Sequence, residues 1–236
     1  MPESVHNQPR ERPSVPPDRT PARVFLRPIG SPLPLGFLGL AVATLALAGQ
    51  DLGWVPSAES HQVAVVMIAF AFPVQIVASV FGFLGRDTVA GSGIGVQAAT
   101  WLTTGIVILT LPPGGRSQTL GLFLFVAAAA LAPAVATASM GKVLAAVVMS
   151  GTMLRWVLTG LYERFGTEAW KHATGWEGVA LCAVALYAAL AFEVEDAQRR
   201  TILPTLRHGQ GRRAIAGGIR DQVRMVEDEA GVREQL

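Results

Sequence analysis

Six blocks of apolar residues dominate the chain, and they are separated by short polar or helix-breaking stretches. The blocks are Leu33–Gly49, Gln62–Leu84, Val89–Leu111, Thr119–Met140, Val143–Tyr162 and Trp176–Phe192. At ~1.5 Å of helix rise per residue, each block reaches about 25 to 35 Å, which is the thickness of one hydrocarbon core. The pattern predicts an all-α integral membrane protein with six transmembrane helices packed as a bundle.

Breakers between the blocks indicate where the chain turns. Pro112-Pro113-Gly114-Gly115 follows the third block, only Gly141-Lys142 separates the fourth from the fifth, and the polar stretch Glu163–Thr174 separates the fifth from the sixth. We therefore expect the transmembrane domain to cover residues 31–204.

Two polar tails flank this domain. Residues 1–30 contain seven prolines and five arginines, a composition that predicts a disordered tail. Residues 205–236 are rich in charge, and Arg212–Gln235 is either an amphipathic helix on the inner leaflet or a solvated tail.

Composition excludes most other classes of protein. The chain is 51% hydrophobic and 15% charged, against about 25% charged residues in average soluble proteins, which argues against a soluble enzyme or a nucleic-acid binder. The single cysteine, Cys182, cannot form an internal disulfide, and the sequence has no Cys/His spacing typical of a metal site. No nucleophile or acid–base set stands out, so we expect neither an enzyme nor a cofactor.

Basic residues predict the orientation. With six spans, the side that holds both tails carries 15 of the 19 Lys and Arg residues, and the other side carries three. An excess of basic residues marks the cytoplasmic face, so both termini are expected in the cytoplasm and the protein in the plasma membrane.

Arg155 is the polar outlier, because it lies in the middle of the fifth block. An arginine at a helix centre costs about 2.5–3.5 kcal/mol on insertion scales, so it must face a cavity or a partner. Thr152, Arg155 and Thr159 share one helix face. Arg155 is either a cation on a pore wall, which would favour an anionic permeant, or an arginine satisfied by carbonyls or by a carboxylate such as Glu177 or Glu193.

Other intramembrane polar and small residues also form patterns. Gln97, Thr100 and Thr104 share a face of the third block, and Gln75 follows Pro73, which predicts a kink in the second. Gly91 and Gly95 form a small-xxx-small pair that favours close helix packing.

Motifs at both ends of the transmembrane region resemble one family. Ser31-Pro32-Leu33-Pro34-Leu35-Gly36-Phe37 is similar to the N-P-A-P-L-G-L signature of the acetate uptake transporter family, the succinate–acetate permeases. Gly175-Trp176, Tyr187 and Arg200-Thr201-Ile202-Leu203-Pro204 resemble the family's G-W…Y…R-T-V-L-P ending. Within the signature, Ser31 replaces the asparagine, whereas Pro32, Pro34 and Gly36 match it.

The resemblance implies six helices per subunit, a hexameric ring and one conduction path through each protomer. It also implies transport of acetate, and in some members succinate, with or without protons. The family's apolar constriction aligns with Leu40, Gln97 and Gly151, which would form a wider and more polar ring here. We place Gln75 and Arg155 on the same pathway, and we hypothesise that Arg155 replaces the aromatic filter by selecting carboxylates through charge.

Two further readings remain open at this point. The chain could carry another small solute through the relaxed constriction, or it could be a non-transporting membrane scaffold. No carboxylate inside the predicted spans offers an obvious proton site, which favours channel-like conduction over symport.

Overall fold

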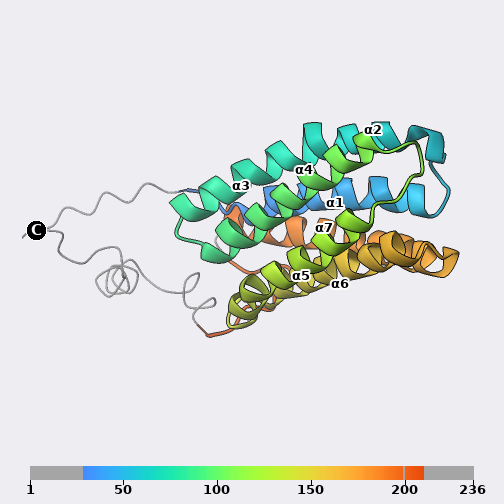
Figure 1. Cartoon of the computed structure of the whole chain (residues 1–236). Helices are drawn as coiled ribbons and strands as arrows, with labels where there is room; N and C mark the ends of the chain where they lie inside the picture. Colours follow the sequence, from blue (N-terminus) through green and yellow to red (C-terminus); the bar gives the residue numbers. More distant parts are fainter. Residues whose placement is uncertain (1–28, 199, 210–236) are drawn as a thin grey trace, which may run out of the picture.

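The computed structural model describes residues 29–198 and 200–209, and these residues form a bundle of long helices. The first span is α1 (Leu33–Asp51). The second is built from η1 (Ser57–Glu59), α2 (Ser60–Val66), the π-helical turn η2 (Met67–Ala71) and α3 (Phe72–Leu84). The third joins the π-helical η3 (Val89–Ile94) to α4 (Gly95–Thr110), and α5 (Gln118–Ser139), α6 (Val143–Phe165) and α7 (Glu168–Gln198) follow. Figure 1 shows these helices side by side.

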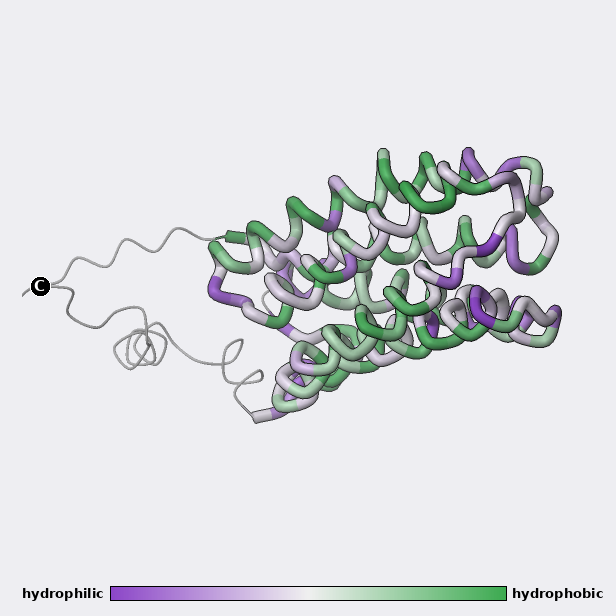
Figure 2. Tube along the Cα trace, viewed as in Figure 1, coloured by the Kyte–Doolittle hydropathy of each residue, from purple (hydrophilic) through white to green (hydrophobic). Residues whose placement is uncertain are grey.

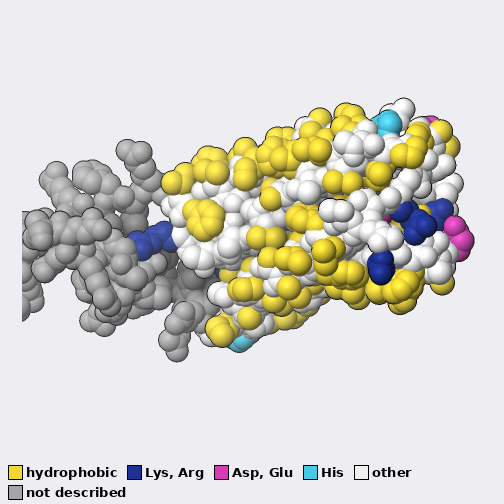
Figure 3. Space-filling model, in the orientation of Figure 1, with side chains coloured by type: hydrophobic (Ala, Val, Ile, Leu, Met, Phe, Trp, Pro, Cys, Tyr) yellow, Lys and Arg dark blue, Asp and Glu magenta, His cyan; other side chains and the backbone are white. Residues whose placement is uncertain are grey.

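Six of these continuous helical segments are long and apolar enough to cross a membrane, which confirms the predicted fold class for the part of the chain that is described. Figure 2 shows hydrophobic residues along the helices and hydrophilic ones gathered toward the turns. In Figure 3, hydrophobic side chains cover much of the visible flank, and charged side chains cluster at the end with the α1–η1, α4–α5 and α6–α7 connections. Such a surface suits a protein whose flank faces lipid.

α1 and α6 are the most buried of the six spanning helices. The most extensive contacts join α5 to α6 and α1 to α7, and α6 also packs against α7. Close approach between α3 and η3 depends on glycine, because a Cβ at Gly82 would come 2.5 Å from the backbone nitrogen of Gly91. The hydroxyl of Ser79 also donates to the Gly91 carbonyl at 2.6 Å. The packing role predicted for the glycines of the third block is thus confirmed at Gly91.

The helix boundary between the fifth and sixth spans differs from the prediction. The polar stretch Glu163–Thr174 is mostly helical, since α6 continues to Phe165 and α7 already begins at Glu168. Gly166 ends α6 in the left-handed conformation, with φ of 66°, which glycine adopts without steric cost. Hydropathy locates the part of a helix inside the membrane, but polar residues with good helix propensity extend the helix beyond it.

The segment after α7 stays packed against the bundle. Glu195 accepts hydrogen bonds from Thr201 at 2.7 Å, Thr205 at 2.9 Å and Arg207 at 2.6 Å, and the His208 amide donates to the Gly141 carbonyl at 3.3 Å. Residues 1–28, which hold most of the predicted disordered tail, lie outside the described residues, and so does the predicted helix or tail Arg212–Gln235.

Candidate functional site

Arg155 lies in the middle of α6 with only 1% of its surface exposed, and its guanidinium links three helices. Its Nη2 donates a hydrogen bond to Oδ2 of Asp51, at the end of α1, over 3.3 Å. Its Nη1 donates to the carbonyl of Thr174 in α7. The same Nη1 lies 3.9 Å from Oε2 of Glu177, one turn further along α7.

Two neighbouring residues of α7 and α6 shape this cluster. A Cβ at Gly178 would overlap Nη1 of Arg155, so glycine at this position leaves the space that the guanidinium fills. The hydroxyl of Thr159 donates to the Arg155 carbonyl at 2.8 Å and lies 2.9 Å from the Thr174 hydroxyl. The arginine therefore occupies one defined position between α1, α6 and α7.

The contacts match the second interpretation of Arg155, that of an arginine satisfied inside the bundle. Glu177, one of the two carboxylates named from the sequence, lies within ion-pair distance, whereas Glu193 is exposed on α7. Asp51 was missed because the predicted span ended at Gly49, and α1 continues to Asp51. Asp51 and Glu177 both lie within helices that are long and apolar enough to cross a membrane, and both lie beside Arg155.

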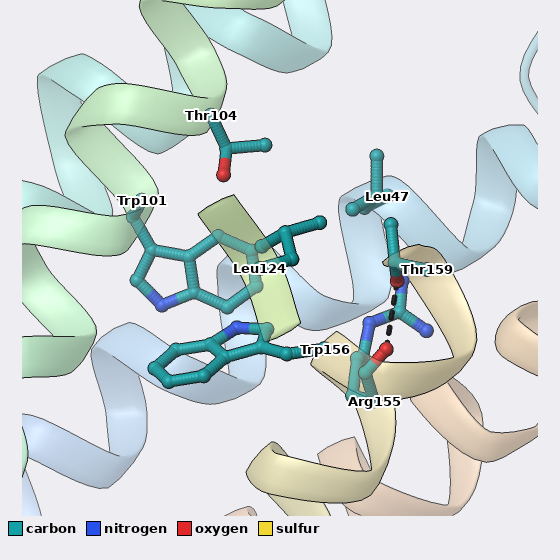
Figure 4. A pocket seen from close by; sticks show the side chains of 7 residues that line it. All are labelled: Leu47, Trp101, Thr104, Leu124, Arg155, Trp156 and Thr159. Carbon is teal, nitrogen blue, oxygen red and sulfur yellow. Dashed lines mark hydrogen bonds between the residues drawn. The ribbon is translucent and has the colours of Figure 1, made fainter. Parts of the chain in front are cut away.

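A small cavity lies on the other side of Arg155. Its volume is about 10 Å³, roughly the space of one water molecule. Figure 4 shows the two indoles on one side of it and Arg155 with Thr159 on the other. The lining comes from α1, α4, α5 and α6, through Leu47, Trp101, Thr104, Leu124, Arg155, Trp156 and Thr159. The cavity is therefore central to the bundle.

Four polar atoms of these lining residues are buried without a hydrogen-bond partner among the described residues. They are the indole Nε1 atoms of Trp101 and Trp156, Nε of Arg155 and the hydroxyl oxygen of Thr104. Indole and guanidinium nitrogens can only donate, and a hydroxyl can donate as well. Burying a donor without an acceptor costs free energy, so this group favours an occupant that accepts hydrogen bonds. A water molecule or an anion meets that requirement, whereas a cation does not.

The structure brings together two of the other predicted pathway residues. Gln75 of α3 and Gln97 of α4 are both fully buried, and Nε2 of Gln75 donates to Oε1 of Gln97 at 3.1 Å. The same nitrogen donates to the carbonyl of Gly36 in α1 at 3.0 Å. Leu40, one turn after Gly36, is fully buried as well.

Gly151 lies in a different environment, because it faces α7. A Cβ there would come 2.8 Å from Cδ1 of Leu181 and 3.8 Å from Oε1 of Glu177. The cavity lining includes Arg155 but not Leu40, Gln75, Gln97 or Gly151. Trp101 and Trp156, which do line it, were not predicted as site residues from the sequence, because an indole in an apolar block is indistinguishable from a packing residue.

The predicted signature residues form the start of the first helix. Ser31 donates its backbone N–H to Oδ2 of Asp196 at 3.2 Å, Pro32 caps α1, and Pro34 lies in the first turn. Gly36 approaches η3 closely, because a Cβ there would overlap the side chain of Ile94. These residues position α1 rather than line the cavity.

Comparison with known proteins identifies the fold. No family model matches the sequence, and a search of curated proteins finds no match. Among solved structures, the chain is similar to the bacterial acetate channel SatP, with a TM-score of 0.68 and 22% sequence identity. The similarity covers 75% of this chain and 99% of that one. The chain therefore has the fold of that acetate channel, as the sequence resemblance predicted.

Proposed function

We propose that this protein carries small carboxylates, acetate above all, across a membrane through a path in each protomer. The observation that carries the proposal is the small cavity between α1, α4, α5 and α6, because its lining residues hold four buried hydrogen-bond donors without a partner among the described residues. The shared fold with an acetate channel supports the same class of solute.

Physical chemistry explains why a carboxylate would need such a path. A carboxylic acid with a pKa near ~4 is almost wholly ionised at neutral pH, and an ion crosses hydrocarbon poorly. Indole and guanidinium N–H groups would replace part of the water that the ion loses. Because the cavity holds about 10 Å³, the side chains that line it must move when an acetate ion passes.

Arg155 would act through its Nε, which has no hydrogen-bond partner in the described part of the chain, rather than as an isolated cation. Its Nη atoms are already engaged by Asp51 and the Thr174 carbonyl, which fix the guanidinium in place. In this proposal Leu40, Gln75, Gln97 and Gly151 lie along the remainder of the path, and Arg155 gives selectivity for carboxylates through the hydrogen bond that its Nε donates.

The proposal also includes a membrane location, an orientation and an oligomeric state. We place the protein in the plasma membrane with both termini in the cytoplasm, on the basis of the basic residues of its tails. We also propose a hexamer, on the basis of the family resemblance. Asp51 and Glu177 are candidate proton-binding groups, since both carboxylates lie beside the cation that borders the cavity. The proposal therefore includes proton-coupled transport as well as channel-like conduction.

The test is uptake of labelled acetate into liposomes that contain the purified protein, with and without an inward proton gradient. Uptake above that of empty liposomes is expected, and acceleration by the gradient would identify proton coupling. Arg155→Gln is expected to reduce uptake, whereas Arg164→Gln, on the exposed face of the same helix, is not. Absence of uptake under both conditions would contradict the proposal.

A further inference from the structure

One buried carboxylate holds the segment that follows α7, residues 200–208, which we call the clasp. Glu195, near the end of α7, is only 2% exposed. Its Oε1 accepts hydrogen bonds from the hydroxyls of Thr201 at 2.7 Å and Thr205 at 2.9 Å. Its Oε2 accepts from Nε of Arg207 at 2.6 Å. All three donors belong to the clasp, and losing them together is costly for a buried carboxylate, so the clasp is held as one unit.

The clasp also reaches the turn between α5 and α6. Arg207 forms an antiparallel backbone bridge with Lys142, and the His208 amide donates to the Gly141 carbonyl at 3.3 Å. Nζ of Lys142 lies 2.5 Å from Oδ2 of Asp87, in the turn between α3 and η3. Figure 1 shows both turns at the same end of the bundle. The clasp therefore links α7 to one turn directly and to the other through Lys142.

The first helix belongs to the same network. Asp196, next to Glu195, accepts a hydrogen bond from the Ser31 amide just before α1. The guanidinium carbon of Arg207 lies 5.3 Å from the ring centre of Phe192, and that ring packs 6.1 Å from the ring of Phe37 in α1. These contacts join elements of all six spans at one end of the bundle. A solute that crosses the bundle must pass between the helix ends that they hold together.

The backbone of the clasp is strained at Leu206. Its φ of 51° lies in the left-handed region, which residues with a side chain seldom adopt. The side chain is 55% exposed, so burial does little to compensate for this conformation. Leu206 lies between Thr205 and Arg207, whose bonds to Glu195 hold it there. Breaking these bonds releases the strain, which favours a second arrangement of the clasp.

We propose that the clasp is a gate, which is closed in this structure and must release before a small carboxylate can pass this end of the bundle. The proposal rests on the proposed function and adds a moving element to it. A strap with a purely structural role would make the same contacts but would keep its position during transport. The two roles therefore differ in whether the clasp moves.

A reversible covalent lock tests whether movement is required. Residues opposite one another in an antiparallel pair have Cα atoms about 4.5–5.5 Å apart, which a disulfide can bridge. Lys142→Cys combined with Arg207→Cys places a cysteine on each side of the bridge, and Cys182→Ala removes the native thiol. Labelled acetate uptake into liposomes is measured for the oxidised and reduced forms of this one full-length variant. Both forms lack the same two ion pairs, so their difference reports the lock alone.

Oxidation is expected to lower uptake by the paired variant at least about tenfold, and a thiol reductant is expected to restore it. Lys142→Cys in the Cys182→Ala protein is the matched control, because it has no second cysteine and its uptake should not respond to the oxidant. Uptake that is equal in the disulfide-bonded and reduced forms of the paired variant would overturn the gate.

Thiol labelling detects the movement itself, and it does so even if the paired variant does not fold. Thr205 is fully buried under the closed clasp, whereas Thr201 is exposed. In the reconstituted Cys182→Ala protein, acetate is expected to raise the reaction rate of Thr205→Cys with a water-soluble maleimide at least about threefold. Thr201→Cys is the control, and its rate should not depend on acetate.

The labelling result also separates the gate from the proposed function. A Thr205→Cys rate that acetate does not change would overturn the gate, whether or not the protein takes up acetate. Acetate-dependent labelling in a protein that moves no acetate would contradict the transport function, and the clasp would still be an element that opens.

Discussion

Replacing Arg155 by glutamine tests the buried ion cluster most directly. The change removes the cation and both Nη donors, and it leaves Asp51 and Glu177 without the cation that lies beside both. The Thr174 carbonyl also loses its side-chain donor. Since Arg155 is 1% exposed, water cannot readily replace those interactions.

The expected cost follows from the geometry of the pair. Breaking a buried ion pair by removing one partner destabilises a protein by about 3–5 kcal/mol, because the other charge stays buried without compensation. At roughly 2–4 °C per kcal/mol for a chain of this size, the midpoint of thermal unfolding should fall by about 10 °C. Asp51→Asn combined with Arg155→Gln removes one of the two stranded charges, so the double variant should be more stable than the sum of the single changes predicts.

Thermal unfolding in detergent provides the assay, with tryptophan fluorescence and monodispersity on size-exclusion chromatography as readouts. Arg164→Gln is the control, because Arg164 makes an exposed hydrogen bond to Gln118 near the end of the same helix. A midpoint for Arg155→Gln within about 2 °C of wild type would refute the reasoning, since that is less than 1 kcal/mol on the same scale. Strict additivity of Asp51→Asn and Arg155→Gln would show that the two side chains do not stabilise one another.

Three further substitutions test the cavity and the helix contacts. Trp156→Phe removes one N–H donor but keeps an aromatic ring, so acetate affinity should fall by about five- to tenfold in a fluorescence titration; unchanged affinity would place the ion elsewhere. Gly178→Ala puts a methyl group where Nη1 of Arg155 lies, so it should lower the unfolding midpoint and acetate uptake together, and a loss of neither would contradict the position of the guanidinium. Gly82→Ala brings a Cβ 2.5 Å from the Gly91 nitrogen, so it should cost about 1–3 kcal/mol in unfolding free energy, and an unchanged midpoint would mean that α3 and η3 can separate freely.

A mild glycine substitution controls for the two severe ones. Gly49→Ala places its Cβ 3.3 Å from Cγ2 of Val55, which a small side-chain movement relieves. Both helical sites gain the same methyl group, so a difference in midpoint between Gly49→Ala and Gly178→Ala reports the crowding at Arg155 and not helix propensity.

Hydrophobic pattern alone predicted the architecture, because a membrane imposes a length and a composition on every span. The predicted block Val89–Leu111 differs by one residue from the observed segment Val89–Thr110. Helix ends outside the apolar part were less predictable, and α7 begins eight residues before the predicted Trp176. Polar residues at these helix ends continue the helix, but their low hydropathy does not indicate that they are helical.

The sequence predicted that individual polar residues would be buried, but it did not predict which residues they would contact. Gln97, Thr100 and Thr104 share a buried face, as their spacing indicated. The pairing of Gln75 with Gln97 depends on how α3 packs against α4, which no local pattern contains. The cavity is harder still to foresee, because its lining draws on four helices and its donors include two tryptophans that look like ordinary apolar residues.

For Arg155, the need to balance a buried charge makes it possible to predict contact partners from the sequence. An arginine inside a bilayer must face a cavity or a partner, so the acidic residues at the ends of other spans form a short list of candidate partners. That argument found Glu177 from the sequence, and it would have found Asp51 if the first helix had been extended by one half-turn beyond Gly49. The same balance then bears on function. A guanidinium held by two carboxylates cannot act as a bare positive charge, so whatever anion the cavity accepts must be recognised mainly by the hydrogen bonds of Nε, the two indoles and Thr104.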